Sequence, residues 1–219
     1  MSSNDKPISP KKRRLERERK YRRDTIIKIA EKFFISQGYS QTMVDKIADE
    51  AGYSKATIYN YFESKDDLFV AVAAIVFEKL FHTFESTLNQ PDIKFELRSL
   101  GDAYVIFLDE YPDYAAFFDP SRLGLAIERM IKKEETNQLL TESEKELRYY
   151  QLKIEKLMRD VILETMKNAG VSTKLDPFSV IMALSTLDSA IRVLLVRGAR
   201  EYLDVLFTII DKGLKHYFD

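Results

Sequence analysis

Two short amphipathic segments, 44–51 and 54–62, constrain the fold of this chain more than any other feature, because Gly52 leaves only a tight turn between them. The first segment has apolar residues at helical spacing, and the second has only Ile58 and Phe62, four residues apart, to hold it against a core. Two helices in this arrangement are typical of a helix-turn-helix, in which the second helix lies in the DNA major groove. Residues 54–62 are therefore the candidate recognition segment.

Helical periodicity continues on both sides of these segments, and no stretch alternates apolar and polar residues as a half-buried strand would. The preceding helix is expected to end at Gly38, and the following helix begins at Ser64 with Asp67 in a capping-box position. Thr141 and Glu144 form another capping box. Five further helices are expected over 92–109, 121–136, 142–168, 177–197 and 200–217. The chain is therefore predicted to be all-α.

The amino-acid composition argues against an enzyme. The 219 residues contain no cysteine, and the two histidines, His82 and His216, lie far apart in the sequence. A disulfide and a thiolate metal site are therefore excluded, and no histidine–carboxylate cluster or glycine-rich phosphate loop is present. We expect no enzymatic activity, no cofactor and no metal. The charged N-terminus and the lack of an apolar run of about 20 residues predict a cytoplasmic protein that does not enter a membrane.

Basic residues are concentrated near the N-terminus. Of the chain's 34 basic and 35 acidic residues, 15 and 9 fall within residues 1–65, a net charge of +6, and the remainder carries −7. Residues 1–20 form a basic arm in which Ser9 and Pro10 are suited to begin a helix. The candidate DNA contacts of the arm are Lys11, Lys12, Arg13 and Arg14. The arm could follow phosphates or enter a minor groove, and the alternative is a solvated tail.

The outward side chains of the recognition segment suit base recognition. Ile58 and Phe62 are expected to face the core, which leaves five candidate base-contacting residues: Lys55, Ala56, Thr57, Tyr59 and Asn60. A lysine can donate to guanine, an asparagine can form two hydrogen bonds with adenine, and alanine or threonine can contact the thymine methyl. The candidate phosphate contacts near the helix termini are Ser54, Thr57, Tyr61 and Lys65. The alternative is a polar surface helix that contacts no nucleic acid.

Four motifs between residues 24 and 70 follow one another in order. They are Gly38-Tyr39, Ile47-Ala48-Asp49-Glu50-Ala51-Gly52, Ser54-Lys55-Ala56-Thr57-Ile58-Tyr59-Asn60-Tyr61-Phe62 and Lys65-Asp66-Asp67-Leu68. In combination they resemble the DNA-binding region of the TetR family of transcriptional repressors. The resemblance implies base contacts from Lys55, Ala56, Tyr59 and Asn60, and backbone contacts from Thr57, Tyr61 and Lys65. Together with the basic arm at 1–20, we expect an N-terminal three-helix helix-turn-helix domain at 21–68 and a C-terminal helical effector-binding and dimerisation domain at 69–219.

Two positions depart from the family pattern. Met43 lies where the family usually has threonine or serine. We expect Thr42, with Asp45 three residues later, to cap the helix instead, and we include Thr42 among the candidate phosphate contacts. Ala56 lies where the family often has glycine, which would change the approach to the bases but not the fold.

The predicted helices at 177–197 and 200–217 carry more apolar surface than one helical layer needs. We therefore expect a four-helix bundle shared by two copies of the chain, as the family resemblance also implies. Such a dimer would place two recognition helices about 34–36 Å apart or at a multiple of this distance. The candidate interface residues are Leu184, Ile191, Leu195, Leu203, Phe207 and Ile210. The alternative is a monomeric core.

Aromatic residues are frequent in the middle of the chain, where the family resemblance implies an effector pocket. The candidate lining residues are Tyr104, Phe107, Tyr111, Phe118 and Tyr149. Aromatic residues also fill ordinary cores, but apolar walls with a few hydroxyls are common in ligand cavities. We therefore expect a small, largely apolar effector.

These observations favour a ligand-responsive transcriptional repressor. The expected protein is a homodimer that binds a palindromic double-stranded DNA operator and releases it when the effector binds. Release would require the effector to prefer a different arrangement of the helix that begins at Ser64. The alternative is a structural or nucleoid-type DNA-binding protein that responds to no effector.

Overall fold

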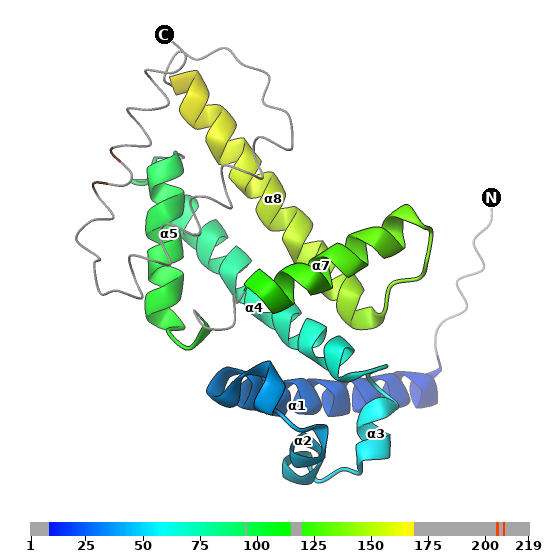
Figure 1. Ribbon diagram of the computed structural model, residues 1–219. Helices are drawn as coiled ribbons and strands as arrows, with labels where there is room; N and C mark the ends of the chain where they lie inside the picture. Colours follow the sequence, from blue (N-terminus) through cyan, green and yellow to red (C-terminus); the bar gives the residue numbers. More distant parts are fainter. Residues whose placement is uncertain (1–8, 95, 115–119, 169–204, 206–207, 209–219) are drawn as a thin grey trace, which may run out of the picture. The chain divides into compact units, whose positions relative to one another are not determined.

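The computed structural model describes residues 9–94, 96–114, 120–168, 205 and 208, and every regular element in the continuous ranges is a helix. The helices are α1 (Pro10–Gln41), α2 (Val44–Ala51), α3 (Lys55–Tyr59), α4 (Lys65–Leu88), α5 (Leu97–Glu110), α7 (Pro120–Glu135) and α8 (Glu142–Asn168) (Figure 1). The all-α prediction is confirmed. Apart from residues 205 and 208, the helices predicted over 177–197 and 200–217 lie outside the described residues. No described helix is long and apolar enough to cross a membrane.

The described residues form two compact units. The first unit contains residues 9–74 and 120–145, and the second contains residues 75–94, 96–114 and those described after residue 145. Both α4 and α8 contribute residues to each unit. The first unit therefore combines the helix-turn-helix with α7 and the start of α8, which come much later in the sequence.

The basic arm and the first predicted core helix are continuous within the 32-residue α1, which is kinked at Gly38. The helix begins as predicted, since Pro10 is its first residue and the Ser9 hydroxyl accepts a hydrogen bond of 3.3 Å from the Lys12 backbone N–H. Gly38, the predicted end, has a φ of 75° and a ψ of 168°, a conformation that glycine adopts without steric cost. The regular helix therefore ends at Gly38 as predicted, and the three residues that follow belong to a short turn beyond this kink.

In the first unit, α2 and α3 pack on one side of α1 (Figure 1). The core between these helices and the start of α4 consists of nearly inaccessible apolar side chains. These are Ile26, Ala30, Phe34, Ile47, Ile58, Phe62, Leu68 and Val72. Each of the larger ones contributes about 1.5–3 kcal/mol through burial, so these few side chains hold the short α2 and α3 in place.

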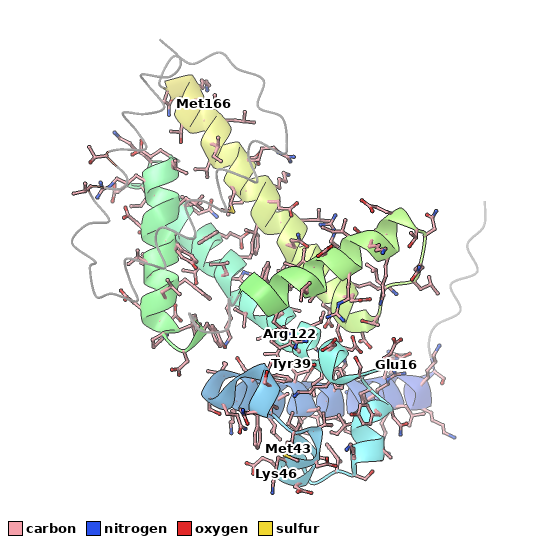
Figure 2. The ribbon with its side chains drawn as sticks, in the orientation of Figure 1. Glu16, Tyr39, Met43, Lys46, Arg122 and Met166 are labelled. Atoms are coloured by element: carbon pink, nitrogen blue, oxygen red, sulfur yellow. The ribbon has the colours of Figure 1, made fainter. Side chains whose placement is uncertain are left out.

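The second unit is built from the later turns of α4, from α5 and from most of α8. Its core includes Val76, Leu80, Leu100, Phe107, Leu147 and Val161. Helix α5 begins at Leu97, five residues later than predicted, because Gln90 and Ile93 close a turn before it. The Leu97 backbone N–H then donates to the Thr165 hydroxyl of α8 at 2.9 Å. Farther along α8, Met166 (labelled in Figure 2) packs with Ile162 against Leu97.

Candidate nucleic-acid interface

Helix α3 is held by two side chains and one cap. Ile58 and Phe62 are both 1% exposed, which confirms the prediction that they face the core. The Ser54 hydroxyl accepts a hydrogen bond of 3.1 Å from the Thr57 backbone N–H, as predicted for an N-cap. The helix is shorter than predicted, because regular geometry ends at Tyr59 and a turn follows, in which the N–H groups of Tyr61 and Phe62 both donate to the Ile58 carbonyl.

Four of the five predicted base-contacting side chains are exposed on this helix and its C-terminal turn. They are Lys55, Ala56, Tyr59 and Asn60. Thr57, the fifth, is half-buried, and its hydroxyl lies 2.9 Å from that of Ser54. The arrangement leaves a polar surface with hydrogen-bonding groups and one alanine methyl at a helix tip, which are the features needed to read base edges.

Lys55 has an internal partner. Its Nζ lies 2.8 Å from Oδ2 of Asp45 in α2, and the hydrogen bond and charge of this carboxylate raise the pKa of Lys55. Both side chains are about half exposed, so the ion pair contributes little to stability. For Lys55 to donate to a base, its ammonium must either break the ion pair with Asp45 or keep it while it donates a second hydrogen bond to the base.

The predicted phosphate contacts differ in their surroundings. Ser54 is exposed, and Tyr61 is half-buried with the Arg19 guanidinium of α1 lying 6.0 Å from its ring centroid. The Lys65 ammonium lies 4.3 Å from the ring centroid of Tyr39, and burial together with the charge of Arg122 lowers the pKa of Lys65. Two hydroxyl groups and two cationic groups, those of Ser54, Tyr61, Arg19 and Lys65, thus lie on or near the recognition helix.

The prediction that Thr42 caps α2 was wrong. The N-cap of α2 is Met43, which makes no side-chain capping bond, and Thr42 is the C-cap of α1. Thr42 is 2% exposed, and its hydroxyl lies 2.7 Å from the Gly38 carbonyl and 3.1 Å from the Phe33 carbonyl. The irregular backbone at Gly38 provides these acceptors, so the buried Thr42 hydroxyl closes the end of α1.

Asp66, in the first turn of α4, is the centre of a charge cluster in the first unit. Its carboxylate accepts a hydrogen bond from the Tyr39 hydroxyl and lies 2.7 Å from Arg129 Nη1 and 3.4 Å from Arg122 Nη1, both from α7. The Arg122 guanidinium also lies 3.8 Å from the Tyr39 ring centroid (Figure 2). Burial of Asp66 opposes its ionisation, but the hydrogen bonds from Tyr39 and Arg129 and the two positive charges outweigh this, so its pKa is lowered.

The same cluster affects Tyr39. Burial, followed by the hydrogen bond to Asp66, raises the pKa of Tyr39 to about 12, so this phenol stays protonated as a donor. Its ring packs against Phe34 and Phe69, with centroid distances of 5.8 and 5.4 Å. Asp66 thereby links the end of α1, the start of α4 and α7.

Two further polar contacts join the helix-turn-helix to the start of α8. Asp67, 8% exposed, accepts hydrogen bonds from the Thr141 hydroxyl at 2.6 Å and from the Glu63 backbone N–H at 3.0 Å. Arg23, 5% exposed, lies 3.4 Å from the Ser143 hydroxyl. The sequence predicted only the capping-box position of Asp67 and the place of Asp66 in a family motif, because their partners Thr141 and Tyr39 lie 74 and 27 residues away.

The candidate effector residues lie in two separate groups in the second unit. Tyr104, Phe107 and Tyr111 form a chain of ring contacts together with Tyr114, with Phe107 fully buried. Tyr149 does not join them: it is 54% exposed and contacts Tyr150, so it does not line the same cluster. Phe118 lies outside the described residues.

The predicted dimer interface cannot be placed in this fold. All six candidate residues lie outside the described residues: Leu184, Ile191, Leu195, Leu203, Phe207 and Ile210. They remain predictions.

Comparison with known proteins supports the DNA-binding assignment. Residues 26–72 match the family model described as bacterial regulatory proteins, tetR family. The HTH-type transcriptional activator FasR of Mycolicibacterium smegmatis is 32% identical over 89 residues, which cover 40% of this chain and 41% of FasR. The chain therefore aligns with about two fifths of the length of this relative.

Solved structures support the fold over a longer range. The fatty acid degradation regulator FadR of Bacillus halodurans has a TM-score of 0.58 at 20% identity, covering 95% of this chain and 96% of FadR. FadR of Bacillus subtilis, solved in complex with stearoyl-CoA, has a TM-score of 0.55 at 18% identity, covering 87% and 96%. At these identities the likeness establishes the fold, and the resemblance expected from the sequence is confirmed by the match over 26–72.

Proposed function

We propose that this chain, whose residues 26–72 form a TetR-family DNA-binding domain, is a ligand-responsive transcriptional regulator that binds a palindromic operator as a homodimer. We favour repression, released by a small, largely apolar effector. FasR is named an activator, so the sign of regulation has to be measured in a reporter assay.

One observation carries the proposal. The exposed side chains of Lys55, Tyr59 and Asn60 project from a short helix that Ile58 and Phe62 hold against the core. Hydrogen-bonding side chains on a helix that is fixed against the core are suited to contact base edges. A surface helix that binds no ligand does not require such side chains in fixed positions.

The test is selection of bound sequences from random duplex DNA at near-physiological salt, with Lys55→Ala as a matched variant. A two-fold symmetric motif is expected, and the variant should lose preference at one base position in each half-site. A specific but asymmetric motif would refute only the homodimer part of the proposal and would leave sequence-specific binding intact. Uniform binding of all sequences would instead favour a structural DNA-binding protein.

The effector part of the proposal is supported by the aromatic cluster of Tyr104, Phe107, Tyr111 and Tyr114 in the second unit. The B. subtilis FadR structure contains stearoyl-CoA, an amphiphile with a long apolar chain. We therefore expect the effector of this chain to share the long apolar chain. A long-chain acyl-CoA should raise the Tm and lower operator affinity, while free CoA serves as the control.

Release requires a helix that both units share. Helix α4 carries Lys65, Asp66 and Asp67 at its start in the first unit and continues to Leu88 in the second. A ligand that prefers one placement of the later turns of α4 would shift the population of arrangements of the recognition helices. A cross-link that holds two recognition helices at the spacing of the operator should abolish release by the effector.

A further inference from the structure

The arm that precedes the family match is helical. Its first turn is capped by Ser9, and the ion pairs Glu18–Arg22 at 2.5 Å and Lys20–Asp24 at 3.0 Å connect successive turns. The arm helix, residues 10–22 of α1, is therefore a continuous extension of the core helix. A helix with side chains is about 10–12 Å across, whereas the minor groove is about 6 Å wide, so this arm does not enter a minor groove as a helix.

One face of the arm helix is turned toward the recognition helix. The Arg19 guanidinium lies 6.0 Å from the Tyr61 ring centroid. The pKa of Arg22 is raised mainly by Glu18, and Tyr61 and Tyr53 lie near enough to raise it further once their phenols are ionised. Figure 1 shows α3 beside the N-terminal half of α1, in agreement with these contacts. Arg19 and Arg22 thus border the same edge as Tyr61, a proposed phosphate contact.

Helical periodicity extends this face toward the N-terminus. At about 100° per residue, Lys12 falls within about 20° of Arg19, and Lys11 within about 20° of Arg22. We call Lys11, Lys12, Arg19 and Arg22 the inner face. Arg17 and Lys20 fall about 100–160° away from Arg19, and they line a shallow depression together with Arg13 on another side of the helix.

We propose that the inner face of the arm helix binds phosphates of the duplex flanking the half-site that α3 reads. This inference rests on the proposed function and assigns to it a second contact region, outside residues 26–72. From Arg19 to Lys11 the helix spans about 12 Å, comparable with the rise of three or four nucleotides along one strand.

The charges on this face agree with a polyanionic ligand. Residues 10–23 contain nine lysines and arginines against two glutamates. One of the glutamates, Glu18, is paired with Arg22 and lies at the edge of the inner face. Leu15, also on the inner face, is 57% exposed, so no part of the described chain covers the face at that position.

The test compares two double variants that remove the same charges from different faces. Lys12→Ala with Arg19→Ala removes inner-face charge, and Arg17→Ala with Lys20→Ala is the matched control; alanine preserves helicity in both. Each is titrated against salt with two duplexes, one ending at the selected operator and one longer by about five base pairs on each side.

We expect the wild type to bind the longer duplex more tightly. The inner-face variant should lose that gain, and its slope of log K against log salt should become shallower by about 1.8 for each bound arm, or about 0.9 per lost phosphate contact. The control variant should keep most of the gain from the longer duplex and most of the wild-type salt slope. Equal losses in the two variants, or no gain of the wild type from the longer duplex, would overturn the proposal while leaving operator binding intact. If the wild type bound no duplex, the proposed function itself would be refuted, and the proposed role of the arm would be refuted as well.

Discussion

Replacing Asp66 by asparagine should weaken the contacts between α1, α4 and α7 and lower the free energy of unfolding by about 2 kcal/mol. The carboxylate lies 2.7 Å from Arg129 and 3.4 Å from Arg122, and Asp66 is about one third exposed. Exposed ion pairs contribute about 0.2–1 kcal/mol, so we assign about 1 kcal/mol to Arg129 and about half of that to Arg122. The Tyr39 hydrogen bond to a charged acceptor adds about 1.5 kcal/mol, part of which asparagine retains.

The assay is urea unfolding of the full chain at one fixed protein concentration, with a double-mutant cycle between Asp66→Asn and Arg129→Gln. A coupling energy of about 1 kcal/mol is expected for this pair, and a smaller one for Asp66 with Arg122→Gln. Coupling energies within error of zero for both arginines would show that the cluster does not hold α7 in solution, and the reasoning would fail.

The same variant has a defined pH dependence. Because the pKa of Asp66 is lowered in the folded state, its stabilising contribution is fully present above the unfolded pKa and is lost as the pH falls through the folded pKa. The stability difference between wild type and Asp66→Asn should therefore be constant from about pH 5 to 7 and should shrink below about pH 4. A difference that grows on acidification would contradict the assignment.

The remaining predictions concern α2, α3 and the start of α4. Ser54→Ala should destabilise the chain by about 1 kcal/mol in urea unfolding, through loss of the bond to the Thr57 N–H, and no change would mean that the cap is redundant. Met43→Ser should stabilise by about 0.5–1 kcal/mol, because α2 lacks a side-chain cap, and a lower unfolding midpoint would refute this. Ile58→Ala should cost about 2–5 kcal/mol and abolish operator binding, measured by circular dichroism and mobility shift. Lys55→Ala should cost about 1–3 kcal/mol at one base position only, whereas Lys65→Ala should weaken binding to all duplexes; equal behaviour in a binding titration would show that their roles were assigned wrongly.

The features that sequence predicted well are local ones. Ser9, Ser54, Ser64 and Thr141 all cap helices as expected, since a cap depends on residues three positions apart. The apolar spacing of Ile58 and Phe62 likewise decided which side of the recognition helix faces the core. The fold class and the exposure of the candidate base-contacting side chains therefore followed from short-range patterns.

The features that sequence reasoning missed depend on distant partners. Thr42 has the residue type of a cap, but the positive φ of Gly38 brings carbonyl oxygens to its hydroxyl and leaves Met43 at the start of α2. Tyr149 has the residue type of a pocket wall, but its position on α8 leaves it exposed. Composition does not encode which face of a helix meets another element, so these assignments required the three-dimensional structure.

The link between Asp67 and Thr141 bears on how this protein can be recombined with others. A chimera cut just after the helix-turn-helix would separate Asp67 from Thr141, Asp66 from Arg129 and Arg23 from Ser143. Arg23 and Asp67 are nearly buried, so a foreign partner would remove a hydrogen bond from each of these two charged groups inside the protein. A transplantable DNA-reading module of this chain therefore has two discontinuous pieces, 9–74 and 120–145, and designs that respect this division should retain its fold.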